Sequence, residues 1–275
     1  MPLTKVQADI LRLLASHRDQ ESYVADSTPL NRTASRISSD IDVFHDREDR
    51  VARAAAEDGA LLEANAYSLQ WIRREPNIYS VMARRGEEAT KLEWVVDSDF
   101  RFFPVVRDDA FGYVLHPADL ATNKVTAAYG RREPRDIVDL LTIHDHILPI
   151  GAAIWASVGK TIGFTPEGVI DEIRRNARYT GSDFRRLASD PPIDPAATMI
   201  RLREILAEAE AFVALMPTEL AGVLFLKGDR VVQPDPVDLA SYQTHAGQRR
   251  GHWPASAEIT AAMFERAAQQ YPATP

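Results

Sequence analysis

Two aspartates flank a single isoleucine in the segment SSDIDVFHD, which runs from Ser38 to Asp46. On a β-strand, Asp40 and Asp42 would point to one face of the sheet and Ile41 to the other. Like charges on one face repel each other, so the pattern becomes favourable when a cation lies between the carboxylates. Mg²⁺ is typically bound by one or two carboxylates together with substrate phosphates. Asp40 and Asp42 are therefore candidate ligands of Mg²⁺ or Mn²⁺, with a solvated strand or turn as the alternative interpretation.

A third acid for such a site is expected on a neighbouring strand. The segment KLEWVVD (residues 91–97) alternates in a way that puts Glu93 and Asp97 on one strand face. A pair of divalent ions held by carboxylates can clamp the attacking and leaving oxygens of a nucleotidyl transfer. Glu93 is the candidate third ligand.

A phosphate-binding signal lies upstream, in VADSTPLN (residues 24–31). A short strand that runs into a small-residue turn at a helix N-terminus presents backbone N–H groups and a helix dipole to an anion. Ser27 and Thr28 could add hydroxyl donors, and Arg36 is a candidate phosphate or base contact. The alternative for Ser27 and Thr28 is a plain helix N-cap.

A basic and acidic signal lies downstream, in NKVTAAYGRREPRDIVD (residues 123–139). Lys124 and Arg131 are seven residues apart and so share one helix face, and Asp136 and Asp139 share a face of the next helix. Arg135 lies beside them. The alternative is a surface ion-pair network without a catalytic role.

Taken together, four ordered motifs resemble a known family. STPLNRTASRISSDIDVFHD, LEWVVDSDFRFFPV, HPADLATNK and GRREPRDIVDL are similar to the nucleotidyltransferase toxins of the AbiEii/AbiGii group, within the DNA polymerase β-like nucleotidyltransferase superfamily. The resemblance covers roughly residues 20–145.

The resemblance implies a role for each residue that matches a family motif. Ser27 and Thr28 match the turn that holds the nucleotide phosphates, and Lys124 matches a lysine that contacts the nucleotide. Asp40 and Asp42 match the metal-binding pair, with Glu93 in the place of the third acid. Arg135, Asp136 and Asp139 match the family's last motif. Of these, Asp136 would assist catalysis.

The implied activity is the metal-dependent transfer of an NMP from an NTP to an acceptor hydroxyl, with pyrophosphate leaving. Relatives are toxins of bacterial toxin–antitoxin pairs, and some add nucleotides to the 3′ end of tRNA. The implied partners are thus an NTP, an RNA acceptor such as tRNA, and an antitoxin protein.

Two positions depart from the family pattern, and both lie in the implied site. Asp26 stands where the family turn usually has glycine, which adopts positive φ without strain. Glu93 replaces the commoner aspartate and is one methylene longer. The alternative function is therefore a catalytically degenerate member of the fold that binds a nucleotide, RNA or protein.

Composition limits the classes of function. The 275 residues carry a net charge of −8, which argues against a surface coated for non-specific nucleic-acid binding but not against a local basic patch. There is no cysteine, so disulfides, thiolate metal sites and a cysteine nucleophile are excluded. The N-terminal residues read as an amphipathic helix and no apolar run approaches a membrane span, so we expect a cytoplasmic protein without membrane contact.

The elements expected to position these residues alternate along the first half of the chain. Strands are expected at 23–24, 40–44, 67–72, 78–84 and 90–96, and helices at 5–17, 47–66, 118–131 and 136–146. Further helices are expected at 150–158, 166–176 and 196–215, followed by a hairpin in GVLFLKGDRVV and a Pro-rich tail. The prediction is an α+β fold: a nucleotidyltransferase core with a small mixed sheet over residues 1–125, then a mainly helical region over 126–275.

Overall fold

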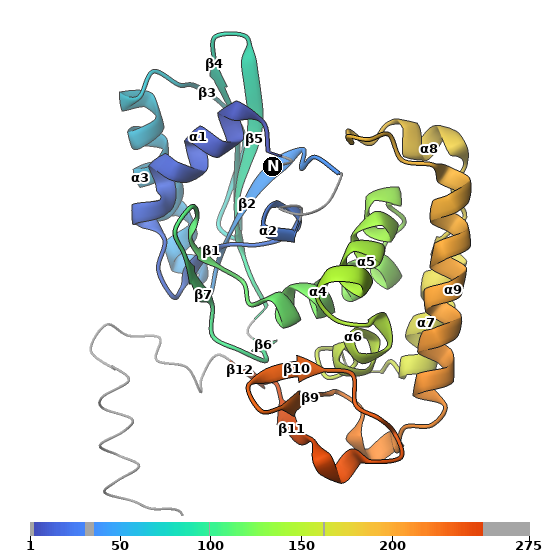
Figure 1. Ribbon diagram of the computed structural model, residues 1–275. Helices are drawn as coiled ribbons and strands as arrows, with labels where there is room; N and C mark the ends of the chain where they lie inside the picture. The colour runs from blue at the N-terminus through green and yellow to red at the C-terminus, as the bar shows by residue number, and fades with distance from the viewer. Residues whose placement is uncertain (1–2, 31–35, 99, 162, 250–275) are drawn as a thin grey trace, which may run out of the picture.

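The computed structural model describes residues 3–30, 36–98, 100–161 and 163–249 (Figure 1). Its largest sheet has seven strands in the order β3-β4-β5-β2-β1-β8-β7. The strands of this sheet are β1 (Ser22–Val24), β2 (Asp40–His45), β3 (Ser68–Glu75), β4 (Ile78–Arg85), β5 (Glu88–Val96), β7 (Val106–Asp108) and β8 (Gly112–Val114). β2 pairs in parallel with β5 and antiparallel with β1, so the sheet is mixed, as predicted.

The α-helices fall into an N-terminal group and a C-terminal group. They are α1 (Lys5–Leu14), α2 (Ser27–Leu30), α3 (Glu48–Ala64), α4 (Pro117–Gly130), α5 (Pro134–His146), α6 (Ile150–Ser157), α7 (Pro166–Asn176), α8 (Gly181–Arg185) and α9 (Pro195–Val213). Among the described residues, no single helix is long and apolar enough to cross a bilayer; α5 and α6, bent by 114°, meet that test only as a pair, on length and composition.

One face of the sheet is apolar and covered by helices. Ile41 and Val43 of β2 and Leu92 and Trp94 of β5 are almost fully buried, because alternate residues of a strand point to the same face. α1 and α3 pack on this face and complete one hydrophobic core (Figure 1). The polar residues between them, including Asp40 and Asp42, consequently point to the opposite face.

A second core is formed by the helices α4, α5, α6, α7 and α9, which contact one another. A small sheet extends it. The predicted hairpin is confirmed as β9 (Val223–Lys227) and β10 (Arg230–Val232), and β11 (Gln243–Ala246) adds a third strand that the sequence did not indicate. The segment QTHA shows no alternation of polar and apolar residues that would indicate a strand, and it becomes one by pairing with β9. α8 was also missed.

The two cores are joined around the start of β2. Tyr23, Ala25 and Leu30 belong to the helical core although they flank the turn after β1. Ile37 donates its backbone N–H to the carbonyl of Ala188 at 2.9 Å. β12 (Gln248–Arg249) pairs with β6 (Phe100–Arg101). The fold class is as predicted, whereas the boundary at residue 125, which falls inside α4, stays a prediction.

Candidate active site

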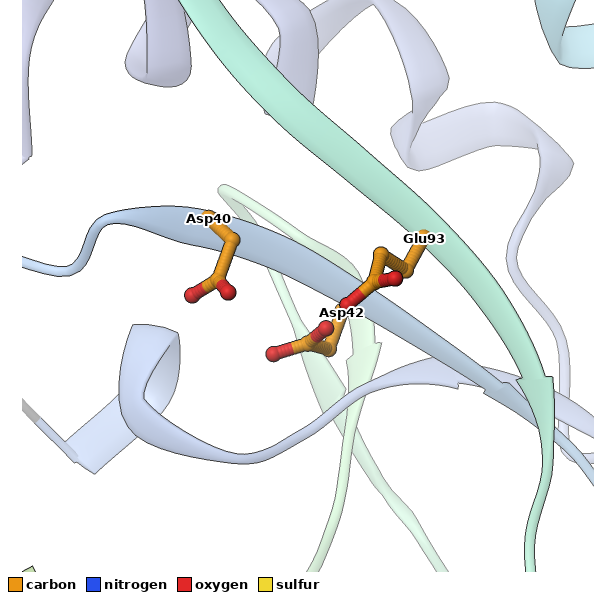
Figure 2. A group of neighbouring side chains, drawn as sticks. All are labelled: Asp40, Asp42 and Glu93. Atoms are coloured by element: carbon orange, nitrogen blue, oxygen red, sulfur yellow. The ribbon is translucent and has the colours of Figure 1, made fainter. Parts of the chain in front are cut away.

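The three predicted metal ligands lie together on the polar face of the sheet. β2 and β5 pair with Asp42 opposite Glu93, and Asp40 lies two residues before Asp42 on the same face (Figure 2). One carboxylate oxygen from each of Asp40, Asp42 and Glu93 lies within 4.8 Å of the other two. The structure thus brings together two adjacent positions of one strand and a third from its parallel neighbour.

The electrostatics of this cluster favour a cation. Asp42 is only 8% exposed. Its burial raises the pKa of Asp42 well above the usual value, and nearby carboxylates raise it further, Asp26 most and then Asp40 and Glu93. A buried carboxylate repelled by its neighbours is stabilised by a positive charge placed between them.

The donor set fits a hard divalent cation. All three side chains offer carboxylate oxygens, which are the ligands that Mg²⁺ and Mn²⁺ prefer. The group is open on one side, because Asp40 and Glu93 are only partly buried, which leaves room for water or phosphate ligands. Lys91 pairs with Glu93 at 2.8 Å and would have to share that carboxylate with an ion.

The turn after β1 adopts the backbone conformation that glycine would favour. Asp26 has φ +57°, in the left-handed region, although it carries a Cβ. Ser27 and Thr28 begin α2 and are buried. The Thr28 hydroxyl donates to the backbone carbonyl of Asp40 at 3.3 Å, which attaches the turn to the strand that carries Asp40 and Asp42.

Lys124 of α4 crosses to this turn and is fully engaged there. Its Nζ donates to Asp26 Oδ1, to Ser27 Oγ at 2.9 Å and to Asp139 Oδ2 at 2.7 Å. Burial alone would lower the pKa of Lys124, but the carboxylates of Asp139 and Asp26 outweigh it and raise the pKa, so the ammonium keeps its proton. The predicted nucleotide-contacting lysine therefore contacts protein groups.

Asp139 of α5 holds the same network from the other side. The Arg36 guanidinium donates to both Asp139 oxygens, at 2.8 and 3.1 Å, and to Ser27 Oγ at 2.5 Å. Arg36 and Asp139 are both buried, so the pair lies within the protein and Arg36 presents little surface to a ligand. The structure thus brings Ser27, Arg36, Lys124 and Asp139 into one network.

Asp136 lies outside this network. It is 1% exposed, and both of its oxygens accept from Arg131, each at 2.9 Å. Arg131 and Arg135 in turn help to lower the pKa of Asp26, so both arginines lie near the turn. Arg135 Nε is buried and has no hydrogen-bond partner among the described residues.

The sequence did not indicate what Asp26 contacts. Its carboxylate pairs with Lys124, which is 98 residues away in the chain. Burial raises the pKa of Asp26, but Lys124 and then the nearby arginines outweigh burial and lower it to about 2. Lys91 was also missed, although its position two residues before Glu93 on one strand placed both side chains on the same face.

A separate groove of about 940 Å³ lies at the other end of the two central strands. Asp46, after β2, and Asp97, after β5, line it together with residues 47–49 at the start of α3. Asp97, predicted to share a strand face with Glu93, lies at this groove and accepts a hydrogen bond from the Tyr23 hydroxyl. It is not a member of the acid cluster formed by Asp40, Asp42 and Glu93.

Comparison with solved structures identifies the fold. The chain is similar to MenT4, a nucleotidyltransferase toxin from Mycobacterium tuberculosis H37Rv, with a TM-score of 0.54 and 17% identity, covering 74% of this chain and 82% of that chain. The chain is also similar to a putative nucleotidyltransferase from H. pylori, with a TM-score of 0.47 and 14% identity. That match covers 76% of this chain and 93% of the other. No family model and no curated protein matches the sequence. The likeness to MenT4 shows that this chain has the nucleotidyltransferase fold.

Proposed function

We propose that this protein is a metal-dependent nucleotidyltransferase that transfers an NMP from an NTP to an acceptor hydroxyl. The observation that carries the proposal is the cluster of Asp40, Asp42 and Glu93 on the polar face of a nucleotidyltransferase fold. In this proposal Asp40, Asp42 and Glu93 hold Mg²⁺ or Mn²⁺, which supplies charge stabilisation to the transferred phosphoryl group and lowers the pKa of the attacking hydroxyl.

The protein's own groups would orient the nucleotide. Ser27 and Thr28 lie on the turn beside the acids and would face the phosphates, with Lys124 as the nearby cation. Asp136 is occupied by Arg131, so we propose that it acts by holding that guanidinium near the turn. Arg36 and Asp139 would act by fixing the position of Ser27.

The acceptor proposed for this site is RNA. Four arginines are exposed in this region: Arg132 just before α5, Arg178 just after α7, and Arg185 and Arg186 at the end of α8. The Arg132 guanidinium donates to the carbonyl of Arg178 and lies 5.6 Å from the ring of Tyr179, so Arg132, Arg178 and Tyr179 lie together. Single-stranded nucleic acid binds where cations track the backbone and an aromatic ring can stack on a base.

These four arginines differ from some, but not all, of the exposed arginines in their ion pairing, since Arg74, Arg84, Arg107, Arg203 and Arg230 also make no ion pair with a described carboxylate. Arg53, Arg73 and Arg174 each pair with a carboxylate. No ion pair to a described carboxylate is made by the arginines at 132, 178, 185 or 186. Cations without a carboxylate partner can bind a polyanion locally, although the net charge of −8 opposes such binding over the rest of the surface.

The toxin assignment rests on likeness. MenT4 is a nucleotidyltransferase toxin, and the motifs of this sequence resemble the AbiEii/AbiGii group. We therefore propose the toxin of a toxin–antitoxin pair, with the 3′ end of tRNA as the first acceptor to examine and an antitoxin protein as a partner.

A second candidate is a member of the fold that binds a nucleotide or RNA without transferring it. The observation that favours it is the engagement of Lys124 by Asp26, Asp139 and Ser27. In that case NTP binding would be measurable and incorporation would not.

Incorporation of α-labelled NTPs separates the two candidates. Each of the four NTPs is incubated with total RNA and purified tRNA in the presence of Mg²⁺ or Mn²⁺, with the wild type and Asp42→Asn in parallel. The proposal predicts label in RNA that is lost without metal and in Asp42→Asn. Binding without any incorporation would support the second candidate, and equal incorporation by Asp42→Asn would overturn the metal-dependent mechanism.

A further inference from the structure

Lys124 has no donor left for a phosphate. A lysine ammonium carries three N–H groups, and in this structure three acceptors, one each on Asp26, Ser27 and Asp139, lie around Nζ. The side chain is 2% exposed. A triphosphate can therefore reach Lys124 only if one of these three acceptors withdraws.

The three acceptors differ in how firmly they are held. Asp139 is 0% exposed and is also bound by Arg36 through both oxygens. Ser27 Oγ is buried and accepts from Arg36 as well. The Asp26 carboxylate is 24% exposed, and Lys124 is its only hydrogen-bonding cation among the described residues. Asp26 is thus the acceptor that can leave at the lowest cost.

Asp26 also lies beside the strand that carries Asp40 and Asp42. It follows β1, whose next residue, Ala25, donates its backbone N–H to the carbonyl of Asp42 at 3.2 Å. The Asp26 carboxylate, like those of Asp40 and Glu93, raises the pKa of Asp42, so it lies near the acid cluster. A carboxylate bound to Lys124 beside the metal ligands occupies the place of an anion in the site.

From this geometry we infer that Asp26 is an internal competitor of the nucleotide phosphates, which occupies Lys124 until a triphosphate displaces it and so sets the affinity of the site for nucleotides. The inference rests on the proposed function. According to this inference, aspartate at the position where the family turn usually has glycine lowers the affinity for NTP. The fold and the acid cluster are not altered by it.

Calorimetric titration tests this inference on the full-length chain. Inorganic tripolyphosphate and each Mg–NTP are titrated into the wild type, Asp26→Asn and Asp26→Gly, with Asp145→Asn as the matched control, since Asp145 pairs with Arg201 on the surface of α5. Both Asp26 variants free the Lys124 ammonium for a charge-assisted hydrogen bond to phosphate, so we expect them to bind tripolyphosphate and Mg–NTP at least about tenfold more tightly than the wild type. The affinity of the control variant should equal that of the wild type. Asp26→Gly also removes the Cβ from a residue at positive φ.

A double-mutant cycle separates the release of Lys124 from a general loss of negative charge. In a Lys124→Met background, Asp26→Asn should bring no gain, because no ammonium is there to be freed; thermal unfolding checks that each variant is folded. A gain that persists without Lys124, or equal affinities of the wild type and both Asp26 variants, would overturn the inference while metal-dependent NTP binding could still uphold the proposed function. No binding of any NTP by folded wild type and folded Asp26 variants would overturn both.

Discussion

The Asp42 carboxylate is buried beside three other acids, and in the absence of a cation this costs stability. Its charge is opposed by burial and by repulsion from Asp26, Asp40 and Glu93, as the raised pKa of Asp42 indicates. Binding of a divalent ion would reverse the sign of this contribution. The residue is therefore expected to lower the stability of the metal-free chain and to raise that of the metal-bound chain.

We predict that Asp42→Asn raises the midpoint of thermal unfolding in EDTA, because it removes the repelled charge and keeps the shape of the side chain. A gain of 1 kcal/mol corresponds to about 2–4 °C for a chain of this size class. With excess Mg²⁺ and NTP the order should invert, because only the wild type gains binding energy. A variant less stable than the wild type in EDTA would contradict this account of the cluster.

His45, at the end of β2, predicts a dependence of stability on pH. The ring is fully buried and neither nitrogen has a hydrogen-bond partner among the described residues. Burial, with a smaller effect of nearby arginines, lowers the pKa of His45 to about 3 from an ordinary value of 6.5. The unfolded chain therefore takes up a proton below pH 6.5 that the folded chain refuses, so stability present above pH 6.5 is lost as the pH falls toward 3.

The expected loss is about 1.4 kcal/mol per pH unit between pH 6 and 4.5, measured by urea unfolding. His45→Leu, which has no titrating group, should show a shallower slope over this range. His116, whose pKa burial also lowers, accounts for a remaining slope of the same sign. An unchanged slope in His45→Leu would show that His45 is not the group responsible.

At the level of elements, the ion network holds α2, α4 and α5 around the start of β2. Asp139 of α5 forms ion pairs with both Arg36 and Lys124, and all three side chains are buried. Removing one partner from a buried ion pair leaves an uncompensated charge in a place of low polarity. The network therefore contributes to the fixed position of the turn that carries Ser27 and Thr28.

We predict that Asp139→Asn destabilises the protein by about 3–5 kcal/mol, measured by urea unfolding. Asp145→Asn is the matched control on the same helix, because Asp145 pairs with Arg201 at the surface, and it should cost less than about 1 kcal/mol. Equal and small losses in the two variants would mean that the buried network does not stabilise the fold.

The elements around the site could be predicted because their patterns are local. Alternation in β2 and β5 indicated which residues face the core, and it placed Asp40, Asp42 and Glu93 on the opposite face before the pairing of the strands was known. β11 could not be found in this way, because it is a short polar segment that becomes a strand only by pairing with β9.

The contacts of the individual site residues could not be predicted, because they join distant parts of the chain. Asp26 and Lys124 are 98 residues apart, and Arg36 and Asp139 are 103 apart. Spacing rules apply within one helix or strand and say nothing about such pairs. The sequence therefore indicated that these residues belong to one site, but not that the cations among them pair with carboxylates of the protein.

At the level of the whole molecule, the proposed RNA contacts are the exposed arginines at 132, 178, 185 and 186, on a chain of net charge −8. Each arginine that neutralises a phosphate releases a counterion, so the affinity for single-stranded RNA should fall with salt at a slope of about −0.7 per contact. We predict that Arg185→Gln combined with Arg186→Gln makes this slope shallower by about 1.4 in a filter-binding series over salt concentration.

Arg53→Gln is the control for that series, because Arg53 is exposed but pairs with Glu57 on α3. Its slope should equal that of the wild type. If the double variant also kept the wild-type slope, the arginine surface would not be where RNA binds, and an acidic protein such as an antitoxin would be the next partner to examine on it.

Uptake of Mn²⁺ tests most directly the claim that the acid cluster is a metal site. Free Mn²⁺ is followed by electron paramagnetic resonance as it is titrated into the wild type, Asp42→Asn, Glu93→Gln and the control Asp145→Asn. The account predicts stoichiometric uptake by the wild type and the control, weakened in Glu93→Gln and lost in Asp42→Asn, since Asp42 is the buried member of the cluster and lies opposite Glu93. Uptake by Asp42→Asn and Glu93→Gln equal to that of the wild type would contradict it.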